Sequence, residues 1–163
     1  MTLQTVQSTQ GRSLDFGALR GKAVVVFYEE RDHVDDNVHL KESCGLLLEG
    51  GSMGDRFEVL GVADVAGLSF VRGIVRTAVK AVAARYGTEL WLDFEGALRE
   101  QPWDLGGAGS AVMVLDPTGR IVFRRKGALD PYDLDAFFEA LGAALDRGAA
   151  RRLELEVVGA RGV

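Results

Sequence analysis

The sequence contains a single cysteine, Cys44, among its 163 residues, and this scarcity limits the kinds of protein it can be. One thiol cannot form a disulfide within the chain, so small disulfide-stabilised folds are excluded. A chain without disulfides fits the reducing cytoplasm, which is the compartment expected for the chain as given. Residues 1–10 have neither a basic start nor an apolar run, so the periplasm is expected only if a signal peptide has been removed.

Basic clusters and long apolar runs are also lacking. The net charge is -5, and the densest basic stretch is only Arg124, Arg125 and Lys126. Nucleic acids and anionic membrane surfaces attract proteins through local positive potential, so neither is expected as a partner. No stretch approaches the roughly 20 apolar residues that span a bilayer, so membrane insertion is not expected either.

Apolar residues make up 47% of the chain, enough for one sizeable core, and their spacing predicts several strands. After a polar lead-in, continuous β-branched and aromatic residues at 23–28 predict a strand buried on both faces. Further strands are predicted over 57–65 and 89–93. A hairpin is predicted over 111–123, because Asp, Pro and Gly stand at favoured positions of a turn at 116–119.

Three helices are predicted from apolar residues that recur three and four positions apart. The first carries Leu40 and Cys44 on its apolar face. The second begins at a Ser69 cap, and the third at an Asp130 cap with Pro131 in its first position. The wide apolar stripe of the second helix consists of Val71, Ile74, Val75, Ala78, Val79 and Val82.

The order of these elements predicts the fold class. Strands and helices alternate in the first half of the chain, which favours parallel strands, and a hairpin and a last helix follow. The sequence therefore predicts an α/β, thioredoxin-like three-layer fold, a mixed central sheet with helices on both faces. Residues 1–150 form the single domain, and 151–163 form a C-terminal tail. Alternation at 151–158 predicts an extra strand that pairs with its own sheet or with a second copy in a homodimer.

Several segments resemble those of known families. Gly21 and Lys22, the stretch 110–123 and the residues 127–129 resemble peroxiredoxins and thioredoxin relatives. The segment 31–40 with Asn37, the Phe-Val-Arg at 70–72 and the Trp-Asp-Leu at 103–105 are similar to the YtfJ-like family of small bacterial proteins. The resemblance covers about residues 12–142. It implies the thioredoxin-like fold and leaves the function open, since members of that family are typically exported and functionally obscure. The chain differs from them in its C-terminal tail and in having no signal peptide.

The resemblance to thioredoxin-like proteins implies where a reactive cysteine would lie in this sequence. Redox members place a reactive cysteine just after the first core strand, where the dipole of the following helix lowers the thiol pKa. Here residues 29–37 hold no cysteine, and the arginine or cis-proline that such proteins carry near Ser110 is absent. Cys44 lies on the apolar helix face with Leu40, so it is predicted to be buried and unreactive. No catalytic residue is therefore predicted, and the alternative is a divergent peroxiredoxin-like thiol oxidoreductase that uses Cys44.

Both histidines lie in the acidic segment that replaces the reactive site. His33, His39 and Asp35 are candidate metal ligands, because Asp35 and His39 share a helix face and imidazole with carboxylate binds zinc, copper or nickel. In the other interpretation, Asp35 and Asp36 cap the helix and His39 is a surface residue. Apart from this metal, no cofactor is expected.

The glycine-rich loop at 93–109 carries Trp103, which either recognises a partner or folds back over the end of the hairpin. The candidate partner or ligand surface consists of Asp32, His33, Asp35, Asp36 and Trp103. With no cysteine at the expected position, the sequence favours a redox-inactive protein-interaction or accessory module over an enzyme. The partner expected is an unknown protein.

Overall fold

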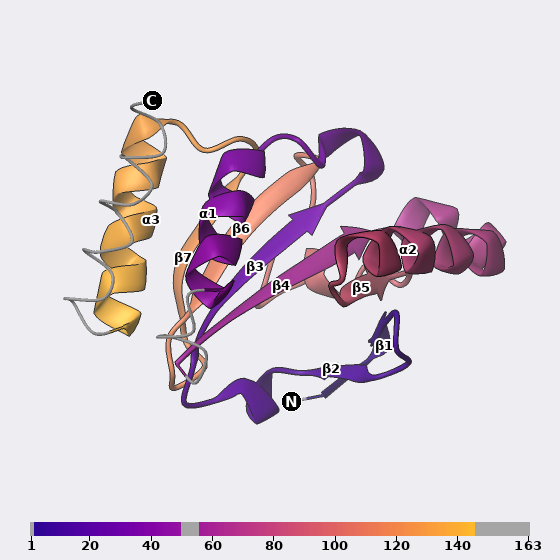
Figure 1. Ribbon diagram of the computed structural model, residues 1–163, viewed down its shortest axis with the longest axis horizontal. Coiled ribbons are helices and arrows are strands. Elements are labelled where there is room, and N and C mark those ends of the chain that lie inside the picture. Colours follow the sequence, from indigo (N-terminus) through magenta and orange to yellow (C-terminus); the bar gives the residue numbers. More distant parts are fainter. Residues whose placement is uncertain (1, 50–55, 146–163) are drawn as a thin grey trace.

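A computed structural model of the chain describes residues 2–49 and 56–145, and its central feature is a seven-stranded mixed sheet (Figure 1). The strands lie in the order β2-β1-β5-β4-β3-β6-β7. Their bounds are β1 Thr2–Ser8, β2 Ser13–Asp15, β3 Ala23–Glu29, β4 Phe57–Asp64, β5 Leu90–Asp93, β6 Ser110–Leu115 and β7 Ile121–Lys126.

The connections confirm the predicted order of strands and helices. Strands β3, β4 and β5 are parallel and are joined by α1 (Val38–Glu49) and α2 (Arg72–Tyr86). The hairpin β6–β7 is antiparallel to β3, and α3 (Pro131–Ala144) follows it. In Figure 1, α2 and α3 lie at opposite ends of the sheet. Short 3-10 helices occur at η1 Phe16–Leu19, η2 Arg31–His33, η3 Ala66–Val71 and η4 Ala97–Arg99.

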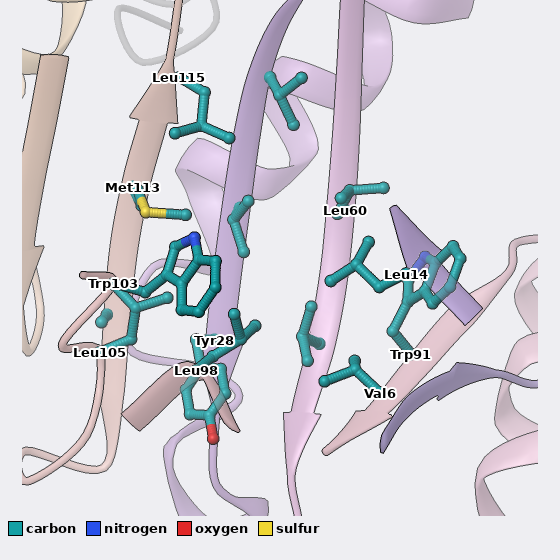
Figure 2. Packing of buried hydrophobic residues seen from close by; sticks show 14 residues of the cluster. Val6, Leu14, Tyr28, Leu60, Trp91, Leu98, Trp103, Leu105, Met113 and Leu115 are labelled. Atoms are coloured by element: carbon teal, nitrogen blue, oxygen red, sulfur yellow. The ribbon is translucent and has the colours of Figure 1, made fainter. Parts of the chain in front are cut away.

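Strand β3 contributes to a core on each face of the sheet, as its continuous apolar run predicts. Val25 and Phe27 pack with side chains of α1 and α3. Val24, Val26 and Tyr28 face the opposite cluster, which η1, η4 and the loop before β6 cover (Figure 2). Helices therefore cover both faces of the sheet. The face of Val24, Val26 and Tyr28 is covered by the short 3-10 helices η1 and η4.

The N-terminal residues differ from the prediction: the sequence analysis treated them as a polar lead-in, whereas they form the hairpin β1–β2. Strand β1 pairs with β5 in the antiparallel sense, and β2 continues the sheet beyond it. The segment 2–8 alternates polar and apolar residues weakly, and Val6 is the side chain that it buries completely. An outer strand with so little apolar content gives almost no period-2 signal, so the pattern was too weak to identify it.

The start and the outer face of α2 also differ from expectation. Ser69 lies within η3, and the residue that precedes α2, Val71, makes no side-chain capping bond. Val75 and Val79 pack beside β5, whereas Ile74 is 73% exposed and Val82 is exposed too. Half of the predicted stripe, Val71, Val75 and Val79, is partly buried, and the other half, Ile74, Ala78 and Val82, is exposed.

The other end signals that lie in the described residues are confirmed. Gly87 ends α2 with a φ of 64°, and Asp130 and Asp133 form a reciprocal capping box around Pro131. None of the described helices is both long and apolar enough to cross a membrane. The predicted helix end at Gly50 and the predicted strand at 151–158 lie outside the described residues.

We predict that Asp130→Ala lowers the free energy of unfolding by about 0.5–2 kcal/mol, because the Asp133 backbone N–H in the first turn of α3 loses its bond to the Asp130 carboxylate. Urea unfolding followed by circular dichroism measures the change. The matched control is Asp135→Ala, at an exposed position on the same helix. Equal stabilities of the two variants would contradict the capping role.

Candidate functional site

The candidate site lies where β3 ends and β6 begins. After β3 the chain forms η2 and a turn before entering α1, and the Glu30 N–H donates to the Gly109 carbonyl at 2.7 Å. The His33 N–H in turn donates to the Glu30 carbonyl at 3.0 Å. The segment 30–37 is therefore held against the residues just before β6, although some 75 positions separate them in the sequence.

One carboxylate connects the two segments. Asp36 Oδ2 accepts a hydrogen bond from Ser110 Oγ at 2.6 Å and lies 3.0 Å from His33 Nδ1. The Ser110 bond, together with that of His33, holds the pKa of Asp36 below its usual value. Because Asp36 stands between the hydroxyl and the imidazole, His33 is not placed to remove the Ser110 proton. The arrangement orients an imidazole that is 41% exposed, and it does not form a nucleophile–base pair.

Gly109 makes room for the His33 ring. A Cβ at this position would lie 2.3 Å from His33 Cδ2, and the glycine φ is +81°. Any side chain here would displace the imidazole and strain the backbone. The ring thus packs directly against the backbone of the chain just before β6.

Asn37 fixes the start of α1 to the residues that follow β7. Its Nδ2 donates to the Gly127 carbonyl at 3.2 Å, and its Oδ1 accepts from the Leu129 N–H at 2.9 Å. The side chain is buried with both ends bonded, so Asn37 is a positioning residue and not a ligand.

Glu29 holds the one buried polar side-chain atom in the described residues that has no hydrogen-bond partner. Lys41 Nζ donates to Glu29 Oε1 at 2.8 Å, whereas Oε2 is buried and unbonded. Burial raises the pKa of Glu29 above its usual value, although Lys41 opposes the shift. Lys41 also donates to the Val34 carbonyl and so ties the end of β3 to the loop before α1.

A second polar group lies beside this site at the ends of β4 and β5, and the sequence analysis missed it. Arg99 Nε lies 3.0 and 2.9 Å from the two carboxylate oxygens of Asp64, and its Nη2 donates to Glu30 Oε1 at 3.2 Å. Asp93 accepts the Tyr28 hydroxyl at 2.8 Å and two backbone N–H groups of η4. Burial, with the charge of Asp93, raises the pKa of Tyr28. The sequence offered one signal for this group: the predicted strands at 57–65 and 89–93 each have an aspartate near their end, Asp64 and Asp93.

Cys44 lies in the middle of α1, with none of its surface exposed, as predicted. It packs in the cluster that α1 and α3 form with the sheet, and burial raises the pKa of its thiol to about 12. At neutral pH the thiol is therefore protonated and shielded from solvent, which is the opposite of a reactive cysteine.

The structure separates the three candidate metal ligands. His33 pairs with Asp36 and not with Asp35, and the exposed His39 lies 3.7 Å from Glu42. In the described part of the chain, no three His, Cys, Asp or Glu side chains converge on a point that could hold a metal ion. The metal prediction therefore gains no support from this arrangement.

Trp103 does not belong to the candidate partner surface, because its side chain is buried. Its side chain is 8% exposed and lies in the cluster of Figure 2, where its ring centroid is 5.9 Å from that of Phe16. The loop folds back because Arg124 donates to the carbonyls of Pro102 and Trp103, and the Leu105 N–H to that of Leu98. Of the predicted surface, there remain Asp32, His33, Asp35 and Asp36. Together with the exposed Val34 they form what we call the loop surface.

Comparison with solved structures identifies the architecture. A lipoprotein thioredoxin of Streptococcus pneumoniae superposes with a TM-score of 0.63 at 16% identity, over 88% of this chain and 99% of its own. A thiol-disulfide isomerase of Corynebacterium glutamicum gives 0.64 at 20% identity, over 90% and 95%. The chain has the thioredoxin-like fold. A bacterioferritin comigratory protein of Xanthomonas campestris shares this fold too, with a TM-score of 0.56 at 15% identity over 96% and 92%. No family model and no curated protein matches the sequence.

We predict that Ser110→Ala raises the pKa of Asp36, because the carboxylate loses its shortest hydrogen bond. A depressed carboxyl pKa contributes stability that is present above the unfolded value of about 3.9 and is lost as the pH falls through the folded pKa. Stability should therefore fall less steeply in acid in the variant. Carbon NMR of the Asp36 carboxyl measures the pKa. Ser43→Ala, at a serine of α1 that bonds only the His39 carbonyl, is the control. An unchanged Asp36 pKa would contradict the network.

Proposed function

We propose that this protein is a thioredoxin-fold binding module that recognises a partner protein through the loop surface and performs no thiol chemistry. One observation carries the proposal: His33 and Asp36, which follow β3, are hydrogen-bonded to each other, and Asp36 also to Ser110 at the start of β6, while the chain's single thiol is buried elsewhere. A fold can keep its architecture while the site placed on it changes.

The loop surface has the character of a recognition element. Asp32 and Asp35 are exposed, Val34 is 45% exposed, and Glu30 lies beside them half exposed. Bonds to Gly109 and Ser110 hold this segment in place, so a partner would meet a preorganised surface. The charges favour a partner segment that is basic and carries a small apolar side chain to contact Val34.

Two further expectations from the sequence belong to this proposal. The similarity of segment 31–40 to the YtfJ-like family falls on the loop surface, which supports a shared role for that segment in the family. We also propose that the tail at 151–158 pairs with a second copy in a homodimer. The loop surface itself follows the inner strand β3 and not an edge strand of the described sheet.

The alternative, a peroxiredoxin-like thiol oxidoreductase, depends on Cys44. We predict that a thiol reagent such as dithionitrobenzoate modifies Cys44 more than about a thousandfold more slowly in the folded protein than in urea. The thiol is buried, and its pKa of about 12 leaves almost no thiolate at pH 7. Rapid labelling of the folded protein, with peroxidase activity that Cys44→Ala abolishes, would overturn the proposal.

We predict that a photocrosslinking amino acid placed at Val34 captures one discrete partner in cells that produce the protein, and that the same group placed at Tyr132 does not. Tyr132 is the matched control because it is 84% exposed but lies on α3. Asp32→Asn with Asp35→Asn should reduce the adduct several-fold, whereas Asp135→Asn should not. Equal adducts from both positions, or an adduct unaffected by the loop charges, would contradict recognition by this surface.

A further inference from the structure

A hollow of about 370 Å³ lies at the opposite end of the sheet from the loop surface. Phe16, Trp103, Leu115 and Ile121 supply its apolar lining, and Arg20 and Arg120 its charged residues. Leu115 pairs with Val24 at the start of β3, and the Gly21 N–H donates to the Pro117 carbonyl at 2.8 Å. The hollow is therefore built between η1 and the β6–β7 turn, and it shares no residue with the site described above.

Its two arginines form no direct ion pair with the described part of the chain. Neither Arg20 nor Arg120 makes a side-chain hydrogen bond or an ion pair with the described part of the chain, and both are exposed. Arg20 Nε lies 3.6 Å from the place that a Cβ on Gly119 would occupy, so its guanidinium stands beside the turn that carries Arg120. The charge of Asp116 attracts Arg120, but the two side chains form no direct ion pair. Asp116 Oδ1 instead accepts from the Thr118 hydroxyl and from the backbone N–H groups of Thr118 and Arg120.

Trp103 brings a hydrogen-bond donor to the same place. Its ring packs at an angle of 34° to Phe16, and Figure 2 shows the indole nitrogen on the side of the ring toward Leu115. Among the described residues no acceptor bonds this N–H, and it is not one of the fully buried unbonded atoms. A buried aromatic lining with an available N–H and two unpaired guanidinium groups resembles a ligand site more than unfilled packing.

We propose that this hollow binds a small organic anion, a carboxylate with a flat apolar body. The body lies against Phe16 and Trp103, and the carboxylate accepts hydrogen bonds from Arg20 and Arg120. Guanidinium groups bind carboxylates in charge-assisted, often bidentate pairs, and an anion between the two arginines also relieves their mutual repulsion. The volume is at the lower end of the range for ligand pockets, about 300–1,000 Å³, so a single ring with a short acidic arm is the appropriate size.

Titration with phenylacetate tests the proposal, with the two tryptophan indole N–H signals in a ¹H–¹⁵N NMR spectrum as the readout. Trp103→Phe assigns the signals. Phenylacetate should shift the Trp103 signal saturably, leave that of Trp91 in place, and raise the melting temperature. Arg20→Gln and Arg120→Gln should each weaken binding about tenfold or more, since each removes a charge-assisted bond. Lys80→Gln, which removes a charge from α2 outside the hollow, should bind as the original chain does.

Two comparison probes separate the parts of the proposed ligand. Phenylacetamide keeps the ring without the charge, and inorganic phosphate keeps a charge without the ring, so both should bind at least tenfold more weakly. Phosphate binding as tightly as phenylacetate would overturn the proposal, because the apolar lining would then play no part. Failure of both phenylacetate and the larger indole-3-acetate to shift the Trp103 signal would also overturn it, as would affinities unchanged in both arginine variants. None of these outcomes bears on partner recognition by the loop surface.

Discussion

The complete burial of β3 is the constraint on which the rest of the structure depends. No side chain from 23 to 28 is more than 2% exposed, so both faces of this strand must be covered by other parts of the chain. On one face α1 and α3 supply Leu40, Cys44, Phe137 and Leu141. Within residues 2–49 and 56–145 no long helix covers the other face, which packs against η1, η4 and the loop at Trp103. Trp103 is therefore a core residue because β3 needs it there.

The polar side chains at the carboxyl ends of the strands follow from the same constraint. Where β3, β4 and β5 leave the core, Glu29, Asp64 and Asp93 are still largely shielded, and a shielded carboxylate must be paired or hydrogen-bonded. Lys41, Arg99 and Tyr28 supply those bonds. Shifted pKa values in this region therefore have a structural explanation, and they do not by themselves indicate catalysis. The unbonded Glu29 Oε2 is the exception to this pairing.

Much of the fold could be predicted from the sequence, because its main signals are local. The apolar run at 23–28, the Asp-Pro-Thr-Gly turn and the Asp130 cap each determine their own element. The features that could not be predicted depend on contacts between distant segments. That α2 packs beside β5 and leaves Ile74 exposed depends on strand order. In the same way, no pattern around residue 36 indicates that its carboxylate bonds Ser110.

The burial of Cys44 is the one site feature that the spacing of apolar residues predicts, since the position of a residue on a helix face determines its burial directly. The sequence predicts only some of the residues that surround His33. The sequence places Asp32, Asp35 and Asp36 near it, but helix geometry would favour Asp35 with His39, whereas the turn before α1 instead brings Asp36 to His33. Candidate ligands in a loop depend on backbone turns that carry no periodic signal.

The contact between His33 and Gly109 supports the proposal that the loop surface recognises a partner. The imidazole of His33 fills the space that a side chain at position 109 would need. Its Nδ1 lies at hydrogen-bond distance from Asp36, and Asp36 also accepts a bond from Ser110. A general base must lie within hydrogen-bond reach of the proton that it removes, and the Ser110 hydroxyl donates to the Asp36 carboxylate and not to His33. What this network provides is rigidity in a segment that exposes Asp32 and Asp35 beside Arg31. A rigid surface with fixed charges favours a partner of complementary charge at a low entropic cost, which is what the proposed binding module requires.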